Sequence, residues 1–215
     1  MIRRSRPVHF AGAIRRGRCS APLKNEGLTP GMTIGLFGGS FDPVHSGHLH
    51  VARTALKQLG LDRIWWIVSP QNPLKTRKAG QFLLRFNGVR DAAIGPRMVI
   101  SDIERRTGIQ TTAELLDVLQ SRHPGVHFVW IMGADNLKQF HRWHRWRDIA
   151  ASIPIAIIAR PQDPIRARLS PAARQMAAHR VSETHAKLIA RRGAPGWTYL
   201  TEPLHREASS RLRET

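Results

Sequence analysis

The chain has 215 residues, of which 41% are hydrophobic, which is typical of one α/β domain with a substantial core. It contains no run of about 18 apolar residues that could span a bilayer, so we expect no membrane partner. Cys19 is the only cysteine, which excludes an internal disulfide and a cysteine-based zinc site. A cytoplasmic protein is therefore expected, and a homo-oligomer is left open.

The charge balance is strongly basic, with 34 Lys and Arg against 15 Asp and Glu and a formal net charge of +19. This balance predicts an anionic partner, which could be nucleic acid, a membrane surface or a phosphorylated small molecule. Much of the excess lies in residues 1–30, where Glu26 is the only acidic residue. We expect residues 1–31 to form a basic, disordered leader and residues 32–215 to form the domain. Because Met32 directly precedes the first strand-like run, a start codon assigned too early is an alternative origin of the leader.

Apolar runs alternate with helix-compatible segments along the chain. Strands are predicted at residues 33–37, 63–69, 97–101, 126–132, 153–160 and 197–200, the last of them as an edge strand. Helical segments are predicted at residues 46–60, 81–93, 111–121, 140–151 and 170–190. Continuous apolar runs indicate parallel strands that are buried on both faces. The predicted fold is therefore a single-domain, Rossmann-like, doubly wound α/β sheet.

Ligands of doubly wound sheets bind outside the carboxyl ends of the strands. The loops that follow Phe37, Ser69, Met132 and Arg160 are therefore the places to search for chemistry. Three of these four loops carry unusual residues.

The loop after the first predicted strand reads GGSFDPVHSGH over residues 38–48. Gly38 and Gly39 allow the backbone to approach a ligand closely, and the following helix N-terminus offers N–H groups to phosphate. His45 and His48 are three residues apart and would lie together at the first helical turn, where they can stabilise negative charge. The simpler interpretation is a glycine turn followed by a helix cap. The string is not a dinucleotide fingerprint, because it lacks the pattern G-x-G-x-x-G.

This string resembles the G-x-F-D-P-x-H-x-G-H signature of the nucleotidyltransferase superfamily, whose members join a nucleoside triphosphate to a phosphate-bearing acceptor. Two further segments make the chain resemble the nicotinate-nucleotide adenylyltransferases. The resemblance implies that ATP is bound by the following residues of the string: Gly38, Gly39, Ser40, Phe41, His45, Gly47 and His48. It also implies that Gly39 and Ser40 contact the acceptor.

The second segment begins with GADNL at residues 133–137 and continues through Phe140, Trp143 and Trp146. An Asp after a buried strand can bind ribose hydroxyls, which makes Asp135 a candidate, and an exposed Trp offers a face to a planar ring. By resemblance to the family, Trp143 stacks on the pyridine ring of the acceptor. The alternative for Trp143 is simple packing against the core, which is the interpretation we adopt for Trp146.

The third segment, ASSRLR at residues 208–213, resembles the family's C-terminal S-S-T-x-[IL]-R motif. Ser209 and Ser210 could bind phosphate at a helix start, and Arg213 could hold the triphosphate with two hydrogen bonds. The match is imperfect at residues 208, 210 and 211. A solvated basic tail is the alternative.

Two other positions complete the predicted site. Lys75, in the loop after the second strand, can neutralise phosphate charge, whereas Arg77 and Lys78 fit a solvated surface. Thr111 and Thr112 stand where the family often has Tyr-Thr before a helix that helps to hold the nicotinate carboxylate. The missing tyrosine makes the identity of the acceptor less secure than the reaction class.

The resemblance implies direct attack by the acceptor phosphate of nicotinic acid mononucleotide on the α-phosphorus of ATP. His45, His48, Lys75 and Arg213 would stabilise charge on the triphosphate, and Mg²⁺ would be held mainly by ATP and water rather than by protein ligands. Nicotinamide mononucleotide and phosphopantetheine are alternative acceptors. A nucleic-acid-binding protein on the same fold is the alternative from another class, and no specific nucleic-acid partner is expected.

Overall fold

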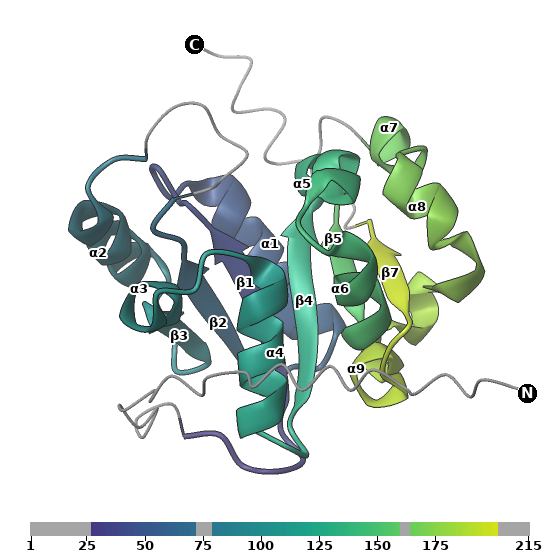
Figure 1. Ribbon diagram of the computed structural model, residues 1–215, viewed down its shortest axis with the longest axis horizontal. Helices are drawn as coiled ribbons and strands as arrows, with labels where there is room; N and C mark the ends of the chain where they lie inside the picture. The colour runs from purple at the N-terminus through teal and green to yellow at the C-terminus, as the bar shows by residue number, and fades with distance from the viewer. Residues whose placement is uncertain (1–26, 72–78, 160–163, 202–215) are drawn as a thin grey trace, which may run out of the picture.

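The computed structural model describes residues 27–71, 79–159 and 164–201. Their strands form one seven-stranded parallel sheet in the order β3-β2-β1-β4-β5-β7-β6 (Figure 1). The strand bounds are β1 (Thr33–Gly39), β2 (Arg63–Val68), β3 (Met98–Ser101), β4 (His127–Gly133), β5 (Ile155–Ile158), β6 (Arg180–Val181) and β7 (Trp197–Leu200). The order reverses between β1 and β4, which is the switch point of a doubly wound sheet. The predicted fold class is confirmed.

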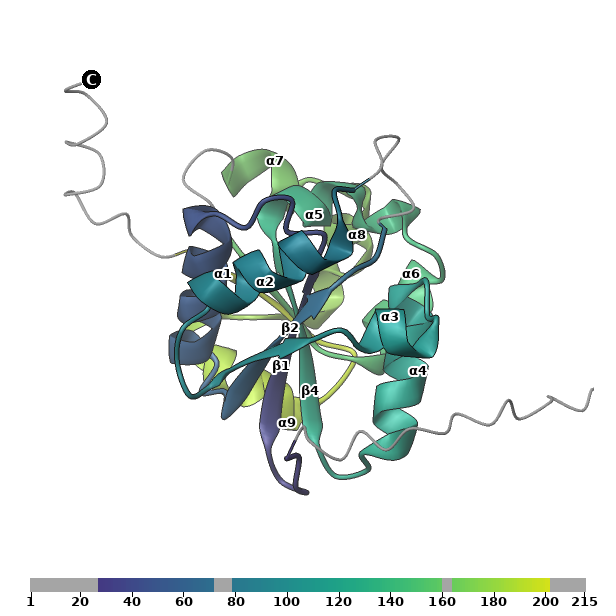
Figure 2. The same ribbon diagram turned by 90° about the vertical axis from the view of Figure 1, so that its left-hand side faces the viewer.

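Helices cover both faces of this sheet (Figure 2). The α-helices are α1 (Ser46–Gln58), α2 (Phe82–Ala92), α3 (Ile103–Thr107), α4 (Thr112–Arg122), α5 (Ala134–Gln139), α6 (Trp146–Ser152), α7 (Pro164–Arg168), α8 (Pro171–Gln175) and α9 (Ile189–Arg192). Three 3₁₀ turns, η1 (Phe140–Arg142), η2 (Ala177–His179) and η3 (Glu183–Leu188), join them within the described ranges. No helix in these ranges is long and apolar enough to cross a membrane.

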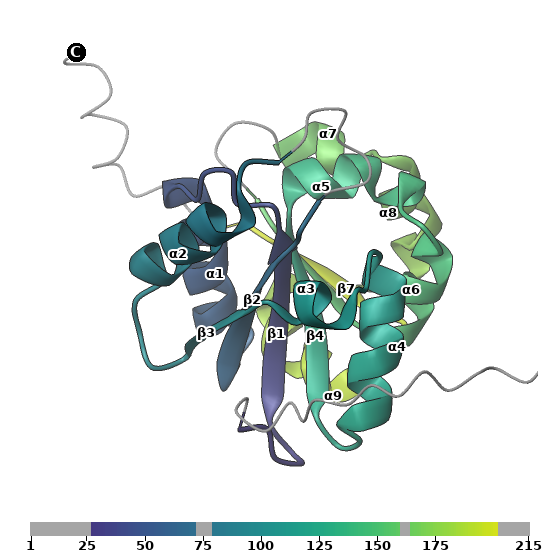
Figure 3. The same cartoon turned by 60° about the vertical axis from the view of Figure 1, so that its left-hand side comes forward.

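Two apolar cores lie on opposite faces of the sheet. Leu36 and Trp130 face the core that α4, α5 and α6 cover, whereas Phe37 and Ile131 face the core that α1, α2 and α9 cover. Figure 3 shows α1 and α2 on one side of the strands and α4 and α6 on the other. Successive residues of each strand thus bury opposite faces, and for this reason the strands appear in the sequence as unbroken apolar runs.

The segment at residues 170–190 differs from the predicted helix. It forms α8, η2, β6, η3 and the start of α9, and the short strand β6 occupies the sheet edge. Val181 pairs in register with Thr198 of β7 and is buried, so sheet pairing and burial override local helix propensity. The prediction that residues 197–200 form the edge strand is therefore wrong, because β7 lies between β5 and β6.

The predicted helical segment at residues 140–151 is also interrupted. It consists of η1 and α6, and the chain between them is extended at Trp143, with φ −73° and ψ 146°. Arg145 then adopts a left-handed conformation at φ 52°, where its guanidinium bonds Asp117 and Asp148 at 2.8 Å each. An additional helix, α5, begins directly after β4. These breaks leave Trp143 on a loop at the carboxyl end of β4.

Candidate active site

A cavity of about 670 Å³ lies at the carboxyl ends of β1, β2 and β4. Its walls come from the loop after β1, the first turn of α1, the start of α4 and the segment from α5 to Trp143. Of the predicted site residues within the described ranges, ten line it: Gly38, Gly39, Ser40, Phe41, His45, His48, Thr111, Thr112, Asp135 and Trp143. Gly47 is not a lining residue. The fold thus brings together positions that are more than 100 residues apart.

Tight packing shapes the loop after β1. A Cβ at Gly38 would lie 2.7 Å from the Trp130 ring, and one at Gly39 would lie 3.0 Å from the Phe41 ring. Packing within the protein therefore excludes a side chain at Gly38 and leaves little room for one at Gly39, in addition to any need for close ligand approach. Phe41 is buried at a φ of 45°, a conformation that side-chain-bearing residues rarely adopt and that occurs preferentially at functional sites.

The two histidines cap helix α1. His45 is the N-cap residue, and its Nδ1 accepts a hydrogen bond from the Gly47 N–H at 3.1 Å. The Nδ1 of His48 in turn accepts from the His45 N–H at 3.2 Å, which completes a reciprocal capping box. Because each Nδ1 is an acceptor, the neutral imidazoles carry their proton on Nε2. The Gly47 N–H thus fixes the orientation of the His45 ring, although Gly47 itself does not line the cavity.

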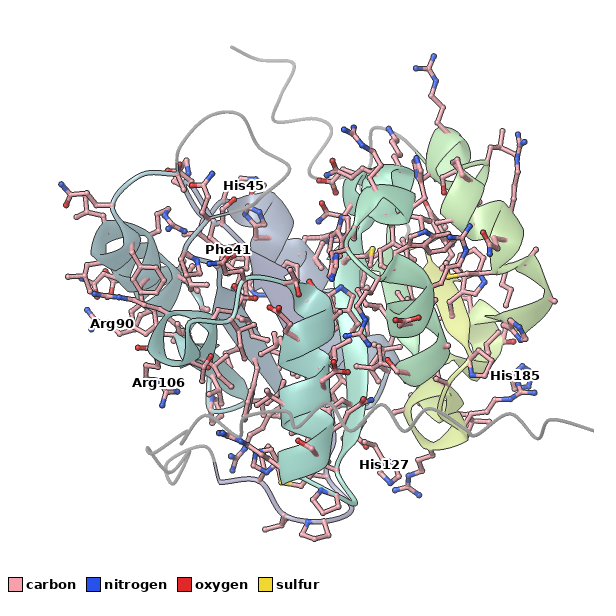
Figure 4. The ribbon with its side chains drawn as sticks, in the orientation of Figure 1. Phe41, His45, Arg90, Arg106, His127 and His185 are labelled. Carbon is pink, nitrogen blue, oxygen red and sulfur yellow. The ribbon has the colours of Figure 1, made fainter. Side chains whose placement is uncertain are left out.

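The rings of His45 and His48 also lie at the N-terminus of α1, where the helix dipole favours an anion. The first turn of α1 contains no acidic side chain, so the positive end of the helix dipole is not offset there. His48 packs edge-on against Phe41, with ring centroids 5.1 Å apart. Figure 4 shows His45 and Phe41 near the carboxyl end of the sheet, far from His127 at the start of β4. Imidazole N–H donors and a helix N-terminus together favour phosphate.

On the other side of the cavity, Trp143 is held by aromatic contacts. Its ring meets Trp130 at 6.1 Å and Phe140 at 5.4 Å between centroids, both in edge-on geometry. Trp143 is half-buried and lines the cavity, while Trp146 is buried in the core, as predicted for that residue. Asp135, in the first turn of α5, is exposed at the same wall. An aromatic ring and a carboxylate therefore lie on the same wall of the cavity.

Thr111 has a structural role in addition to its place in the cavity wall. It is the N-cap of α4, where its hydroxyl accepts from the Glu114 N–H at 3.4 Å. The Glu114 carboxylate accepts from the N–H groups of Gln110 and Thr111, and these backbone hydrogen bonds lower its pKa. Thr112 begins the helix and also lines the cavity. The interaction of these threonines with an acceptor remains a prediction.

Sequence reasoning missed two buried charged residues at the site. Glu104, in the first turn of α3, lines the cavity although it is only 6% exposed. Burial raises the pKa of its carboxyl to about 7, and a hydrogen bond with the Ser69 side chain opposes that shift. Arg85 on α2 is 4% exposed and lies behind the loop after β1. The loop after the third predicted strand was not among those singled out, although the rule about strand ends applies to it equally.

Four predicted site residues, Lys75, Ser209, Ser210 and Arg213, lie outside the described residues, as do Arg77 and Lys78. Most of the predicted leader also lies outside, so the proposed domain boundary stays a prediction. Within residues 27–71, 79–159 and 164–201, no three His, Cys, Asp or Glu side chains gather as a metal site. The expectation that ATP and water hold Mg²⁺ stays a prediction.

The cavity at the switch point of the parallel sheet thus has the glycine-histidine loop on one side and Trp143 on the other. The family model described as cytidylyltransferase-like matches residues 36–211. The chain belongs to this family, which confirms the membership that its glycine-histidine string predicts. A probable nicotinate-nucleotide adenylyltransferase of Roseobacter denitrificans is 49% identical over 183 residues, covering 85% of this chain and 92% of that protein. Another from a Caulobacter species is 51% identical over 183 residues, covering 85% and 97%.

Solved structures agree on the fold. Plasmodium falciparum nicotinic acid mononucleotide adenylyltransferase complexed with NaAD matches with a TM-score of 0.62 at 18% identity, over 85% of this chain and 83% of that one. The same enzyme complexed with APC gives a TM-score of 0.60 at 18% identity, with the same coverage. At this identity the likeness establishes the architecture alone.

Proposed function

We propose that the protein transfers the adenylyl group of ATP to nicotinic acid mononucleotide, giving deamido-NAD and pyrophosphate. The observation that carries this proposal is one cavity with two different walls. One wall offers the glycine loop and the two histidines, and the other offers Trp143 and Asp135. The walls suit the triphosphate of one substrate and the ring and ribose of the other.

In the proposed reaction an oxygen of the acceptor's 5′-phosphate attacks the α-phosphorus of ATP. A new P–O bond forms, the bond from the α-phosphorus to the bridging oxygen breaks, and pyrophosphate leaves with that electron pair. The protein then acts by positioning the two phosphates and stabilising charge. His45 and His48 are suited to this role, because their capping hydrogen bonds fix the rings and place the protons on Nε2.

Mg²⁺ would enter with ATP and neutralise phosphate charge during the transfer. ATP and water would hold the cation, and the exposed Asp42 carboxylate in the cavity wall offers oxygen atoms that could accept hydrogen bonds from its water ligands. Lys75 and Arg213 would add positive charge, as the family resemblance implies. ATP is an intracellular substrate, so we also propose a cytoplasmic location.

The decisive experiment measures pyrophosphate release from ATP and Mg²⁺ with three acceptors offered in parallel: nicotinic acid mononucleotide, nicotinamide mononucleotide and phosphopantetheine. We expect strong preference for the first. Preference for another acceptor would preserve the reaction class and refute the proposed specificity. His48→Ala is the matched variant, in which turnover should fall by about two to three orders of magnitude with the fold retained. Near-normal turnover in that variant would refute the role of the histidine.

A further inference from the structure

Arg85 makes an unusual set of contacts for an arginine on a peripheral helix. Its guanidinium donates to four backbone carbonyl oxygens: Ser40 at 2.6 Å, Ser69 at 2.8 Å, Pro70 at 2.9 Å and Gly80 at 2.9 Å. The residue is 4% exposed, whereas helical arginines usually extend into solvent. A guanidinium carries five donors in a planar fork and no acceptor, so carbonyl groups are suitable partners for it.

These carbonyls belong to two different loops at the site. Ser40 lies in the loop after β1, between Gly39 and the strained Phe41. Ser69 and Gly80 lie on either side of the loop after β2, so one side chain joins both of its ends. The Gly80 N–H also donates to the Asp42 carboxylate at 3.0 Å. Because Asp42 lies in the loop after β1, this hydrogen bond joins the same two loops. Arg85 therefore braces the two loops against each other.

The Arg85 side chain is also a buried positive charge. Burial lowers the pKa of Arg85, while the nearby carboxylate of Asp42 raises it. The guanidinium remains charged at neutral pH, because arginine is not deprotonated in proteins. Truncating Arg85 would leave four backbone acceptors without their donor, which is costly for those that stay buried. Lysine would preserve the charge, but its point-like ammonium cannot reproduce a planar fork.

We propose that Arg85 is a positioning residue for adenylyl transfer, which holds the Ser40 backbone so that the loop after β1 receives the phosphates of ATP in reactive geometry. The inference rests on the proposed function. Arg85 does not line the cavity, whereas Ser40 and Ser69 do, so its effect passes through the backbone of these two residues. A displacement of about 1 Å in such a loop can cost about 100-fold in rate.

The test compares Arg85→Lys, Arg85→Met and the control Arg90→Ala in adenylyl transfer, at a temperature where each is folded by circular dichroism. Arg90 lies on the same helix, its side chain is 62% exposed, and it points away from His45 (Figure 4). We expect kcat of Arg85→Lys to fall about 10- to 100-fold and that of Arg85→Met to fall further. KM for the mononucleotide should stay within about threefold, because the Trp143 wall is unchanged.

A purely structural role predicts a different pattern. Folded Arg85→Lys would then have the kcat of the wild type, with only its unfolding midpoint lowered, and kcat within about twofold of wild type would overturn the proposal. Calorimetric titration with a non-hydrolysable ATP analogue separates this result from failure of the proposed function. If the wild type transfers no adenylyl group, weaker binding of the analogue by Arg85→Lys still supports the proposal that Arg85 positions the loop after β1 for phosphate binding. Equal binding by both proteins would refute it.

Discussion

The imidazole rings of His45 and His48 lie close together, with their centroids 3.8 Å apart and their planes tilted by 33°. Each ring caps the same helix start through Nδ1, so the pair serves the fold and presents Nε2–H groups for charge stabilisation. These two tasks use different nitrogen atoms. A substitution that replaces only Nδ1 or only Nε2 can therefore separate helix capping from charge stabilisation.

His45→Asn should separate capping from catalysis. Asparagine is among the best N-cap residues and can replace the Nδ1 acceptor, but it has no group at the position of Nε2. The free energy of unfolding should therefore change by less than about 0.5 kcal/mol, while kcat falls about 100-fold or more. His45→Ala should lose both, with about 1 kcal/mol of stability. Urea unfolding and pyrophosphate release measure the two effects, and full activity of His45→Asn would show that Nε2 is dispensable.

Trp143→Ala should weaken binding of the acceptor more than it weakens the fold. Stacking of an aromatic side chain on a base contributes about 1–3 kcal/mol, so KM for the mononucleotide should rise about tenfold, and Trp143→Phe should retain most of the affinity. Trp146→Phe is the control, because Trp146 is buried and absent from the cavity wall. A lowered unfolding midpoint with unchanged KM in Trp143→Ala would identify a packing residue instead.

The features that could be predicted from sequence are those that local pattern encodes. β1, β2 and β4 are continuous apolar runs because both faces of each are covered, and the cavity lies at their carboxyl ends, beside three of the four loops singled out from the sequence. The string at residues 38–48 combines a glycine turn with a helix start, so its conformation also follows from local residue types. The histidine pair was expected at the first turn of this helix, where it lies.

The features that could not be predicted depend on distant partners. An arginine within a helical segment is typical of a solvated surface, and only the tertiary fold brings the Ser40 and Ser69 carbonyls to Arg85. β6 has two residues, too few for a periodic signal, and forms only because β7 pairs with it. The break at Trp143 reflects aromatic contacts with Trp130 and Phe140, which sequence spacing does not specify.

Gly38→Ala should destabilise the protein, because its Cβ would lie 2.7 Å from a buried Trp130 ring. Overpacking of this kind costs about 1–3 kcal/mol. Gly88→Ala is the matched control: Gly88 lies within α2, and a Cβ there would meet only Val44, at 3.8 Å. This control should gain up to about 1 kcal/mol from helix propensity. Urea unfolding measures both, and combining Gly38→Ala with Trp130→Phe should recover part of the loss if the clash is its cause.

Glu104 should make the stability of the protein depend on pH near neutrality. Its carboxyl has a pKa of about 7 in the folded state, raised by burial from an ordinary value of 4.5. The folded state therefore binds more protons than the unfolded state between these values, and stability falls as pH rises. The stabilisation that comes from the proton on the buried Glu104 carboxyl is fully present below about pH 4.5. It decreases as the pH rises from 4.5 to about 7, and it is lost above pH 7. The pKa difference corresponds to about 3 kcal/mol, as an order of magnitude.

The substitution Glu104→Gln tests this pH dependence, because it removes the titrating carboxyl group and preserves the size of the side chain. The free energy of unfolding of the wild type relative to Glu104→Gln, measured in urea at pH 5 and pH 8, should decrease with pH by an amount of this order. Glu114→Gln serves as the control, because the pKa of Glu114 is lowered and its carboxyl stays ionised at both pH values. If the difference between wild type and Glu104→Gln is the same at pH 5 and pH 8, the Glu104 carboxyl is ionised in the folded protein throughout this range. Ser69 would then be stabilising the carboxylate more strongly than burial destabilises it.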